Sequence, residues 1–191
     1  MFVHSSAVVD EGAVVGNGSK IWHFSHIMGS ASIGEDCVIG QNCFIGENVV
    51  IGNNVKIQNN VSIFEGVEIE DNVFVGPSVV FTNVVKPRSA FSTNKTYQKT
   101  IVKKGSTIGA NSTVICGNKV GQYSMIGAGS VVNKEVIQYS LVVGNPIRTI
   151  DWIGETGQSL KINGYEAVDM DSKKKYTVTY ENNQIIKIEE L

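Results

Sequence analysis

A repeat of six residues runs through the first 81 positions of this 191-residue chain. Every sixth position from Val3 onward holds a large apolar residue: Val9, Val15, Ile21, Ile27, Ile33, Ile39, Ile45, Ile51, Ile57, Ile63, Ile69, Val75 and Phe81. Two positions earlier in each unit, the residue is small or a valine. Three positions later it is mostly Gly, Asn or Asp, the residues that tolerate the left-handed backbone conformation of turns.

These three registered series predict an all-β fold, a parallel β-helix built from hexapeptide repeats. Each repeat forms a short strand and a corner, and three repeats close a triangular coil of about eighteen residues. The large apolar side chains then point inward and stack on those of the next coil, about 4.8 Å away. We expect about seven such coils over the repeat region.

The period fails after Phe81 and resumes at Val102, and the polar residues between them predict a loop over 83–100 that leaves one corner. Beyond Asp151 the repeat ends. We therefore predict a β-helix domain over residues 1–151 and a C-terminal appendage over 152–191. Two alternating segments, 175–180 and 185–188, predict a β-hairpin around Asn182 and Asn183, and we expect the appendage to cap the solenoid.

Composition excludes several classes of protein. Sixteen Lys and Arg against eighteen Asp and Glu give a net charge of −2, which argues against nucleic-acid binding. We see no signal peptide and no membrane-spanning segment, and three cysteines without a CxxC pair indicate neither disulfides nor zinc. We therefore expect a cytoplasmic protein without a metal. Cys37 and Cys43 fall in the small inward series, so we expect them to pack in the core.

A few residues are not required by the repeat. Asn83 lies where the predicted loop leaves its coil, and Glu65, eighteen residues earlier, should lie at the same corner one coil below. Arg88 follows Pro87 within the loop. His23 and His26 lie about three coils, roughly 14 Å, below Asn83. They could approach a group held by Asn83 only across a subunit boundary.

Five motifs resemble those of the hexapeptide-repeat acyltransferases, in particular the bacterial nucleotide-amino-sugar N-acetyltransferases. They are Ile21-Trp22-His23-Phe24, Ile57-Gln58-Asn59-Asn60-Val61-Ser62, Phe81-Thr82-Asn83 with Pro87-Arg88, Thr107-Ile108-Gly109-Ala110-Asn111 and Val142-Val143-Gly144-Asn145-Pro146. The branch most similar to this chain acetylates UDP-2-acetamido-3-amino-2,3-dideoxy-glucuronate. The resemblance covers residues 1–160 and not the C-terminal tail.

The resemblance implies a left-handed β-helix that forms a homotrimer, with active sites between subunits. It implies transfer of acetyl from acetyl-CoA to the amine of a UDP- or dTDP-linked sugar, a step in making surface polysaccharide such as lipopolysaccharide O-antigen. Asn83 resembles the asparagine that holds the sugar amine, and Glu65 is a candidate proton acceptor. The remaining candidates are His23, His26, Asn59 and Arg88 for the sugar nucleotide, and Gly109, Ala110, Gly127, Ala128, Asn145, Pro146 and Arg148 for acetyl-CoA.

Three alternatives remain open at this stage. The sugar nucleotide is either a UDP-linked 3-amino-glucuronate or a dTDP-linked 3-amino-dideoxyhexose. A zinc hydratase of the carbonic-anhydrase type shares the β-helix, but it needs three histidine ligands, and the loop of this chain contains no histidine. A non-catalytic solenoid, such as an ice-binding protein, would need regular threonine ladders and would have no use for a polar loop.

Overall fold

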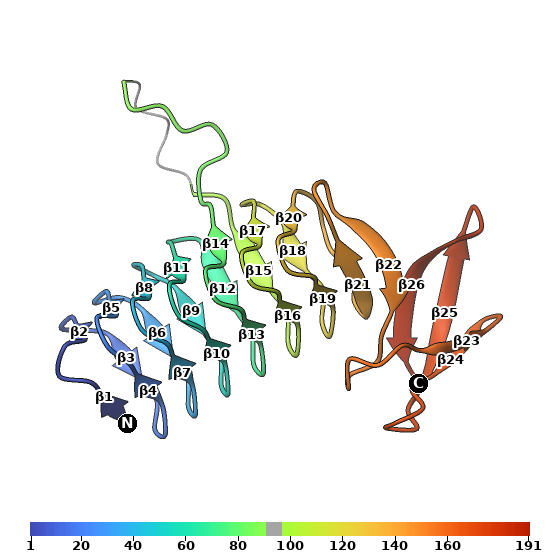
Figure 1. The fold of residues 1–191 in the computed structure, drawn as a ribbon, viewed down its shortest axis with the longest axis horizontal. Helices are drawn as coiled ribbons and strands as arrows, with labels where there is room; N and C mark the ends of the chain where they lie inside the picture. The colour runs from blue at the N-terminus through green and yellow to red at the C-terminus, as the bar shows by residue number, and fades with distance from the viewer. Residues whose placement is uncertain (91–96) are drawn as a thin grey trace.

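The computed structural model describes residues 1–90 and 97–191. Short strands stack in coils along one axis, the N-terminus lies at one end, and a separate C-terminal sheet lies at the other (Figure 1). This arrangement confirms the predicted parallel β-helix. No helix in the described ranges is long and apolar enough to cross a membrane.

Three parallel sheets form the faces of the solenoid, and the chain visits them in the order A, B, C. Sheet A contains β1 (Phe2–Val3), β4 (Lys20–Ile21), β7 (Val38–Ile39), β10 (Lys56–Ile57), β13 (Phe74–Val75), β16 (Thr107–Ile108), β19 (Met125–Ile126) and β21 (Ser140–Val143), followed by the antiparallel β22 (Arg148–Trp152). Sheet B contains β2 (Val8–Val9), β5 (His26–Ile27), β8 (Phe44–Ile45), β11 (Ser62–Ile63), β14 (Val80–Phe81), β17 (Thr113–Val114) and β20 (Val131–Val132). Sheet C contains β3 (Val14–Val15), β6 (Ser32–Ile33), β9 (Val50–Ile51), β12 (Val67–Ile69), β15 (Thr100–Val102) and β18 (Lys119–Val120).

We number the coils as layers, from layer 1 (β1–β3) to layer 7 (β19 and β20), with β21 beginning an eighth. The turns are named after the sheets they join, so an A/B corner links a sheet A strand to the following sheet B strand. Strand partners are eighteen residues apart up to layer 5, as in Lys56 and Phe74. Across the loop the step becomes 33 residues, as in Val80 and Thr113.

The core is the stack of large aliphatic side chains that the repeat predicts. From Ile21 to Val132 these residues are at most 2% exposed, which removes nearly all of their apolar area from water. The small inward series is also buried, and its serines are bonded to backbone carbonyls, as in Ser25 Oγ to Gly40 O at 2.7 Å. Cys37 and Cys43 lie in this series and are core residues, as predicted, and burial raises the pKa of both thiols.

The corners have the left-handed backbone that the third series predicts. Asn42, Asn48, Asn54, Asn60 and Asn72 all have φ between 53° and 61°. Asparagine adopts this region at lower cost than most residues, so its recurrence at the corners follows from the backbone geometry.

The long loop leaves the solenoid between β14 and β15 (Figure 1). Residues 91–96 of the predicted loop lie outside the described residues. The prediction of 83–100 is wrong at its end, because Thr100 already belongs to β15. Its N–H donates to Gly66 O at 2.8 Å, and its side chain is buried in the small inward position.

The C-terminal residues form a four-stranded antiparallel sheet of β23 (Lys161–Asn163), β24 (Glu166–Val168), β25 (Lys175–Glu181) and β26 (Gln184–Glu190). β25 and β26 are the predicted hairpin around Asn182 and Asn183. The sheet contacts the end of the solenoid through Tyr176, whose ring meets that of Tyr139 edge-on with centroids 5.0 Å apart. Gln138 also donates to the carbonyl of Ile188 at 2.5 Å. The appendage therefore covers the C-terminal end of the core.

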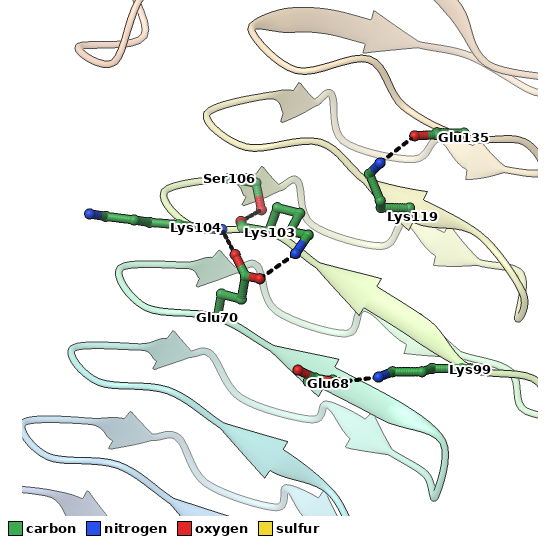
Figure 2. A network of polar contacts seen from close by, with 8 residues as sticks. All are labelled: Glu68, Glu70, Lys99, Lys103, Lys104, Ser106, Lys119 and Glu135. Carbon is green, nitrogen blue, oxygen red and sulfur yellow. Dashed lines mark hydrogen bonds and ion pairs between the residues drawn. The ribbon is translucent and has the colours of Figure 1, made fainter.

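The outer surfaces of the sheets differ in charge. Figure 2 shows ion pairs over sheet C and its edges, where Lys99 meets Glu68 at 2.6 Å and Lys119 meets Glu135 at 2.8 Å. The outward residues of sheet B contain no Lys, Arg, Asp or Glu; they are Val8, His26, Phe44, Ser62, Val80, Thr113 and Val131. Exposed ion pairs stabilise little but keep a surface hydrated, so sheet C has the character of a solvent face and sheet B does not.

Candidate active site

Asn83 lies at the root of the loop, at the B/C corner of layer 5. Its carbonyl accepts the N–H of Gln98 at 3.2 Å, which closes the stem of the loop. The preceding residue, Thr82, is fixed to the layer above, because its Oγ1 accepts the N–H of Cys116 at 3.0 Å. The half-buried Asn83 carboxamide forms no hydrogen bond with any of the described residues. The backbone of Asn83 is therefore fixed, while the donors and the acceptor of its carboxamide are free.

Glu65 lies one layer below Asn83 at the same corner, because Ser62 pairs with Val80 and the eighteen-residue step continues through the turn. One oxygen of its carboxylate accepts Asn48 Nδ2 at 3.0 Å. Arg88 lies further out in the loop and is exposed, and its guanidinium donates to the carbonyl of Pro87 at 2.8 Å. The structure thus places Asn83, Glu65 and Arg88 on one edge of the solenoid.

Four of the seven predicted cofactor residues stack at the A/B corners of layers 6 and 7: Gly109, Ala110, Gly127 and Ala128. A Cβ on Gly109 would come within 2.5 Å of the nitrogen of Ala128, so only glycine permits this close backbone stacking. The N–H groups of Gly109 and Gly127 are bonded to the layer above. The N–H groups of Ala110 and Ala128 have no acceptor among the described residues.

A lower layer shows why the N–H group of Ala110 is free. At the A/B corner of layer 3, the N–H of Gln41 donates to Asn59 Oδ1 of the next layer at 2.9 Å. The same capping bond recurs at another corner, where Glu35 N–H donates to Asn53 Oδ1 at 2.8 Å. Ala128 lies one layer above Ala110, in the same relation as Asn59 to Gln41. The methyl group of Ala128 cannot accept a hydrogen bond. The alanines therefore leave a strip of uncapped backbone donors.

Asn59 was predicted to bind substrate, and its side-chain oxygen is used in this capping bond to Gln41. The structure therefore gives the side-chain amide oxygen of Asn59 a role within the fold.

His23 and His26 lie in layer 2. The His23 ring stacks on His4 at the A/B corner with centroids 3.5 Å apart. His26 lies on the outer surface of sheet B, where its Nε2 meets Asp10 Oδ2 at 3.0 Å and its ring meets Phe44 edge-on. With layers about 4.8 Å apart, both histidines are roughly 14 Å below Asn83 in the same chain. The structure does not bring them together with Asn83.

Asn145, Pro146 and Arg148 lie in the turn after β21 and at the start of β22. Arg148 is exposed and lines a cavity of about 190 Å³ together with Lys134. Neither cation forms an ion pair within the described ranges, and the adjacent Glu135 is paired with Lys119. Lys134 was not predicted, because nothing in the sequence indicates that the end of layer 7 faces the start of β22.

Most of the predicted residues thus form two groups on the two edges that border sheet B, while His26 lies on the face of sheet B between them. Asn83, Glu65 and Arg88 lie on the B/C edge, whereas the Gly-Ala strip, His23 and Asn59 lie on the A/B edge. Within one chain the face of sheet B separates them. Among residues 1–90 and 97–191, no group of three or more His, Cys, Asp and Glu side chains could hold a metal ion.

Two family models match parts of the chain. The C-terminal domain of GMPPB matches residues 23–86, and the hexapeptide repeat of succinyl-transferase matches residues 99–134. The chain is also similar to the dTDP-3-amino-3,6-dideoxy-alpha-D-galactopyranose 3-N-acetyltransferase of Aneurinibacillus thermoaerophilus, with 46% identity over 80 residues. That match covers 42% of each protein, so the chain spans less than half the length of this curated relative.

Solved structures share the fold over a larger part of the chain. A hexapeptide-repeat acetyltransferase of Vibrio cholerae, complexed with acetyl coenzyme A, has a TM-score of 0.56 at 25% identity, and the match covers 75% of this chain and 72% of that one. An N-acyltransferase of Bacillus cereus, in complex with dTDP and coenzyme A, has a TM-score of 0.53 at 20% identity over 81% of both chains. The second likeness is one of fold alone.

Proposed function

This chain is a hexapeptide-repeat protein with a left-handed parallel β-helix, and we propose that it is an acetyl-CoA-dependent N-acetyltransferase acting on a nucleotide-linked amino sugar. The observation that carries the proposal is the strip of uncapped N–H groups at Ala110 and Ala128. Outward backbone donors at a glycine-lined surface suit an extended ligand with amide and thioester carbonyls, which is the chemistry of acetyl-CoA. The relatives that bind acetyl coenzyme A or transfer acetyl to an amino sugar support this assignment.

We place the reacting groups at the boundary between two copies of the chain. In a three-fold assembly with sheet B facing the axis, the A/B edge of one copy lies next to the B/C edge of its neighbour. That arrangement brings the Ala110–Ala128 strip of one copy to the Asn83 of the next, at levels one to two layers apart. The outward positions of sheet B, which include no Lys, Arg, Asp or Glu, and the ion pairs over sheet C support this orientation of a homotrimer.

The proposed chemistry is attack of a neutral sugar amine on the thioester carbon. Asn83 accepts a hydrogen bond from the amine and directs its lone pair, so most of the rate comes from orientation. The backbone N–H groups of the alanine strip stabilise the negative charge that develops on the carbonyl oxygen. As the C–N bond forms and the C–S bond breaks, the amine proton passes to the departing thiolate or to Glu65, and no metal is required.

For the substrate we propose a 3-amino sugar linked to a pyrimidine nucleotide. The UDP-linked 3-amino-glucuronate follows from the sequence motifs, and the dTDP-linked 3-amino-dideoxyhexose has support from the 46% identical relative. Arg88 suits the anionic part of either molecule, since diphosphate and a sugar carboxylate both accept its guanidinium. The product would serve the synthesis of surface polysaccharide.

The test is an acetyl-CoA thiol-release assay over a panel of UDP- and dTDP-linked 3-amino sugars, with 4-amino sugars and the free amino sugars as controls. We expect turnover with at least one 3-amino sugar nucleotide and much less with its 4-amino isomer. Thiol release that is the same with and without every sugar nucleotide would contradict the proposal.

A further inference from the structure

Three aromatic residues occupy left-handed corner positions in the described part of the chain. Phe24 has φ of 57°, Tyr123 of 52° and Tyr139 of 60°. A bulky side chain in this region is strained, and the equivalent residues at other corners are Asn, Asp, Ser or Gly. Each of these aromatic rings therefore needs a compensating contact.

For the two tyrosines the compensating contact is visible. The rings of Tyr123 and Tyr139 are stacked with centroids 5.5 Å apart, and Tyr139 packs against Tyr176 of the appendage. Tyr139 is 1% exposed. At these two strained corners, the aromatic ring thus packs against another ring, and through Tyr139 this packing reaches the appendage.

Phe24 has no such cover. It is 69% exposed, the highest exposure among the chain's phenylalanines for which the structure gives a value. Its backbone is fixed, because its N–H donates to Ser6 Oγ at 3.2 Å. A fixed and exposed ring at a strained position indicates that the compensating contact comes from a molecule outside the chain.

The neighbours of Phe24 add further aromatic rings to this corner, and the Phe24 ring is tilted by 51° from that of His23, with centroids 6.1 Å apart. The planes of Trp22 and His23 lie within 6° of each other, and His23 is itself stacked on His4. The His4 ring is in turn held by Ser6, with Nδ1 and Oγ 2.9 Å apart. We call Trp22, His23 and Phe24, supported by His4, the aromatic platform.

The platform lies on the same A/B edge as the Ala110–Ala128 strip. It belongs to layer 2, whereas Asn83 belongs to layer 5, so the two levels are about 14 Å apart. A sugar nucleotide whose amine lies at the level of Asn83 and whose diphosphate runs down this edge would bring its base to the platform. Aromatic side chains bind bases by stacking, with little dependence on which base is present.

We infer that the aromatic platform stacks against the pyrimidine base of the nucleotide-linked sugar. The inference rests on the proposed function for the identity of the ligand, and it adds Trp22 and Phe24 as residues that bind the nucleotide. It explains why a phenylalanine stands where the next two layers have Asn42 and Asn60.

The variant that separates binding from folding is Phe24→Asn. Asparagine occupies the same corner position in the next two layers, so the variant should fold at least as well as the parent protein. We expect its dissociation constant for UDP or dTDP, measured by calorimetry, to rise about ten-fold or more. The affinities for pyrophosphate and for acetyl-CoA should stay unchanged. Asp36→Asn, at a corner on another edge, is the matched control and should bind UDP normally.

Fluorescence gives a direct measure of stacking. The chain has two tryptophans, so Trp152→Phe leaves Trp22 as the single reporter. UDP should quench its emission with the dissociation constant found by calorimetry, and pyrophosphate should not. Quenching by UDP that persists fully in Phe24→Asn with unchanged affinity would overturn the role of Phe24.

Three further outcomes decide between this inference and its alternatives. If Phe24→Asn breaks the assembly of the protein, Phe24 contacts a second copy of the chain and the inference is wrong. If no sugar nucleotide is acetylated but UDP still quenches Trp22, the proposed function fails while base stacking stands. If acetylation occurs and Phe24→Asn binds UDP normally, the inference alone fails.

Discussion

At a corner of the β-helix, the side chain one layer above decides whether a backbone N–H group is free. Asn59 caps the N–H of Gln41, whereas Ala128 leaves that of Ala110 without an acceptor. An unbonded N–H at the surface is a donor for a ligand, and two in a column suit an extended one. A single residue thus distinguishes the capped corner at Gln41 from the uncapped corners at Ala110 and Ala128, which we assign to acetyl-CoA.

Replacing Ala128 by asparagine should supply the missing cap. In Ala128→Asn we expect the new Oδ1 to accept the N–H of Ala110, as Asn59 does for Gln41, and to raise stability by up to about 1 kcal/mol. The KM for acetyl-CoA should rise because a donor is withdrawn. Thermal unfolding and steady-state kinetics measure both effects. The reverse change, Asn59→Ala, should lower stability with little effect on acetyl-CoA, and a normal KM in a folded Ala128→Asn would refute the assignment.

The proposed role of Asn83 is also that of a single residue, and it concerns the reaction itself. Asn83→Ala should lower kcat by about 10²-fold or more, because the sugar amine is no longer directed at the thioester. Its KM for acetyl-CoA should change little, since the proposed cofactor contacts lie on the other edge. His23→Asn and His26→Asn should cost much less in kcat. Near-normal turnover in Asn83→Ala, together with an inactive histidine variant, would mean that a histidine is the base.

The strands of the solenoid could be predicted from the sequence because each inward position recurs every six residues. For residues before the loop, the six-residue count also predicts the corner at which each candidate residue lies. The capping bonds were missed, although they join residues eighteen apart such as Gln41 and Asn59. β22, β23 and β24 were also missed, because their pairing depends on contacts without a period, such as Tyr139 with Tyr176. The division into domains at residue 151 stays a proposal, since β22 (Arg148–Trp152) crosses it while pairing with β21.

The turn between β24 and β25 should make the appendage sensitive to acid. Burial raises the pKa of Asp169, but hydrogen bonds to its carboxylate from the N–H groups of Asp171 and Ser172 and from Thr156 outweigh it, so the pKa is lowered. A lowered folded-state pKa contributes stability above the unfolded value of about 3.8, and this contribution is lost as the pH falls through the folded value. Near-ultraviolet circular dichroism of the tyrosines between pH 5 and pH 2 should report it. Asp169→Asn should flatten this pH dependence, whereas the exposed Asp171→Asn should retain it.

At the scale of the whole molecule, the two halves of the proposed site meet only between copies. This arrangement requires that sheet B, and not sheet C, lies in the interface. Phe44→Glu puts a charge on sheet B, and we expect it to convert the proposed trimer to monomers in light scattering. Val50→Glu puts the same charge on an exposed position of sheet C and should leave the trimer intact. A trimer that survives Phe44→Glu but not Val50→Glu would mean that the other face is buried.

Mixing two impaired variants tests whether the site is shared. Asn83→Ala damages the B/C edge, and Ala128→Asn damages the A/B edge of the same chain. In a trimer assembled from both variants in equal amounts, a site is intact when the first variant supplies the A/B edge and the second supplies the B/C edge. Random assembly gives this combination at about a quarter of the sites. Co-expression should therefore recover about a quarter of the parent activity at low acetyl-CoA, where each variant alone is weak. Activity no higher than the mean of the two separate variants would show that each site lies within a single chain.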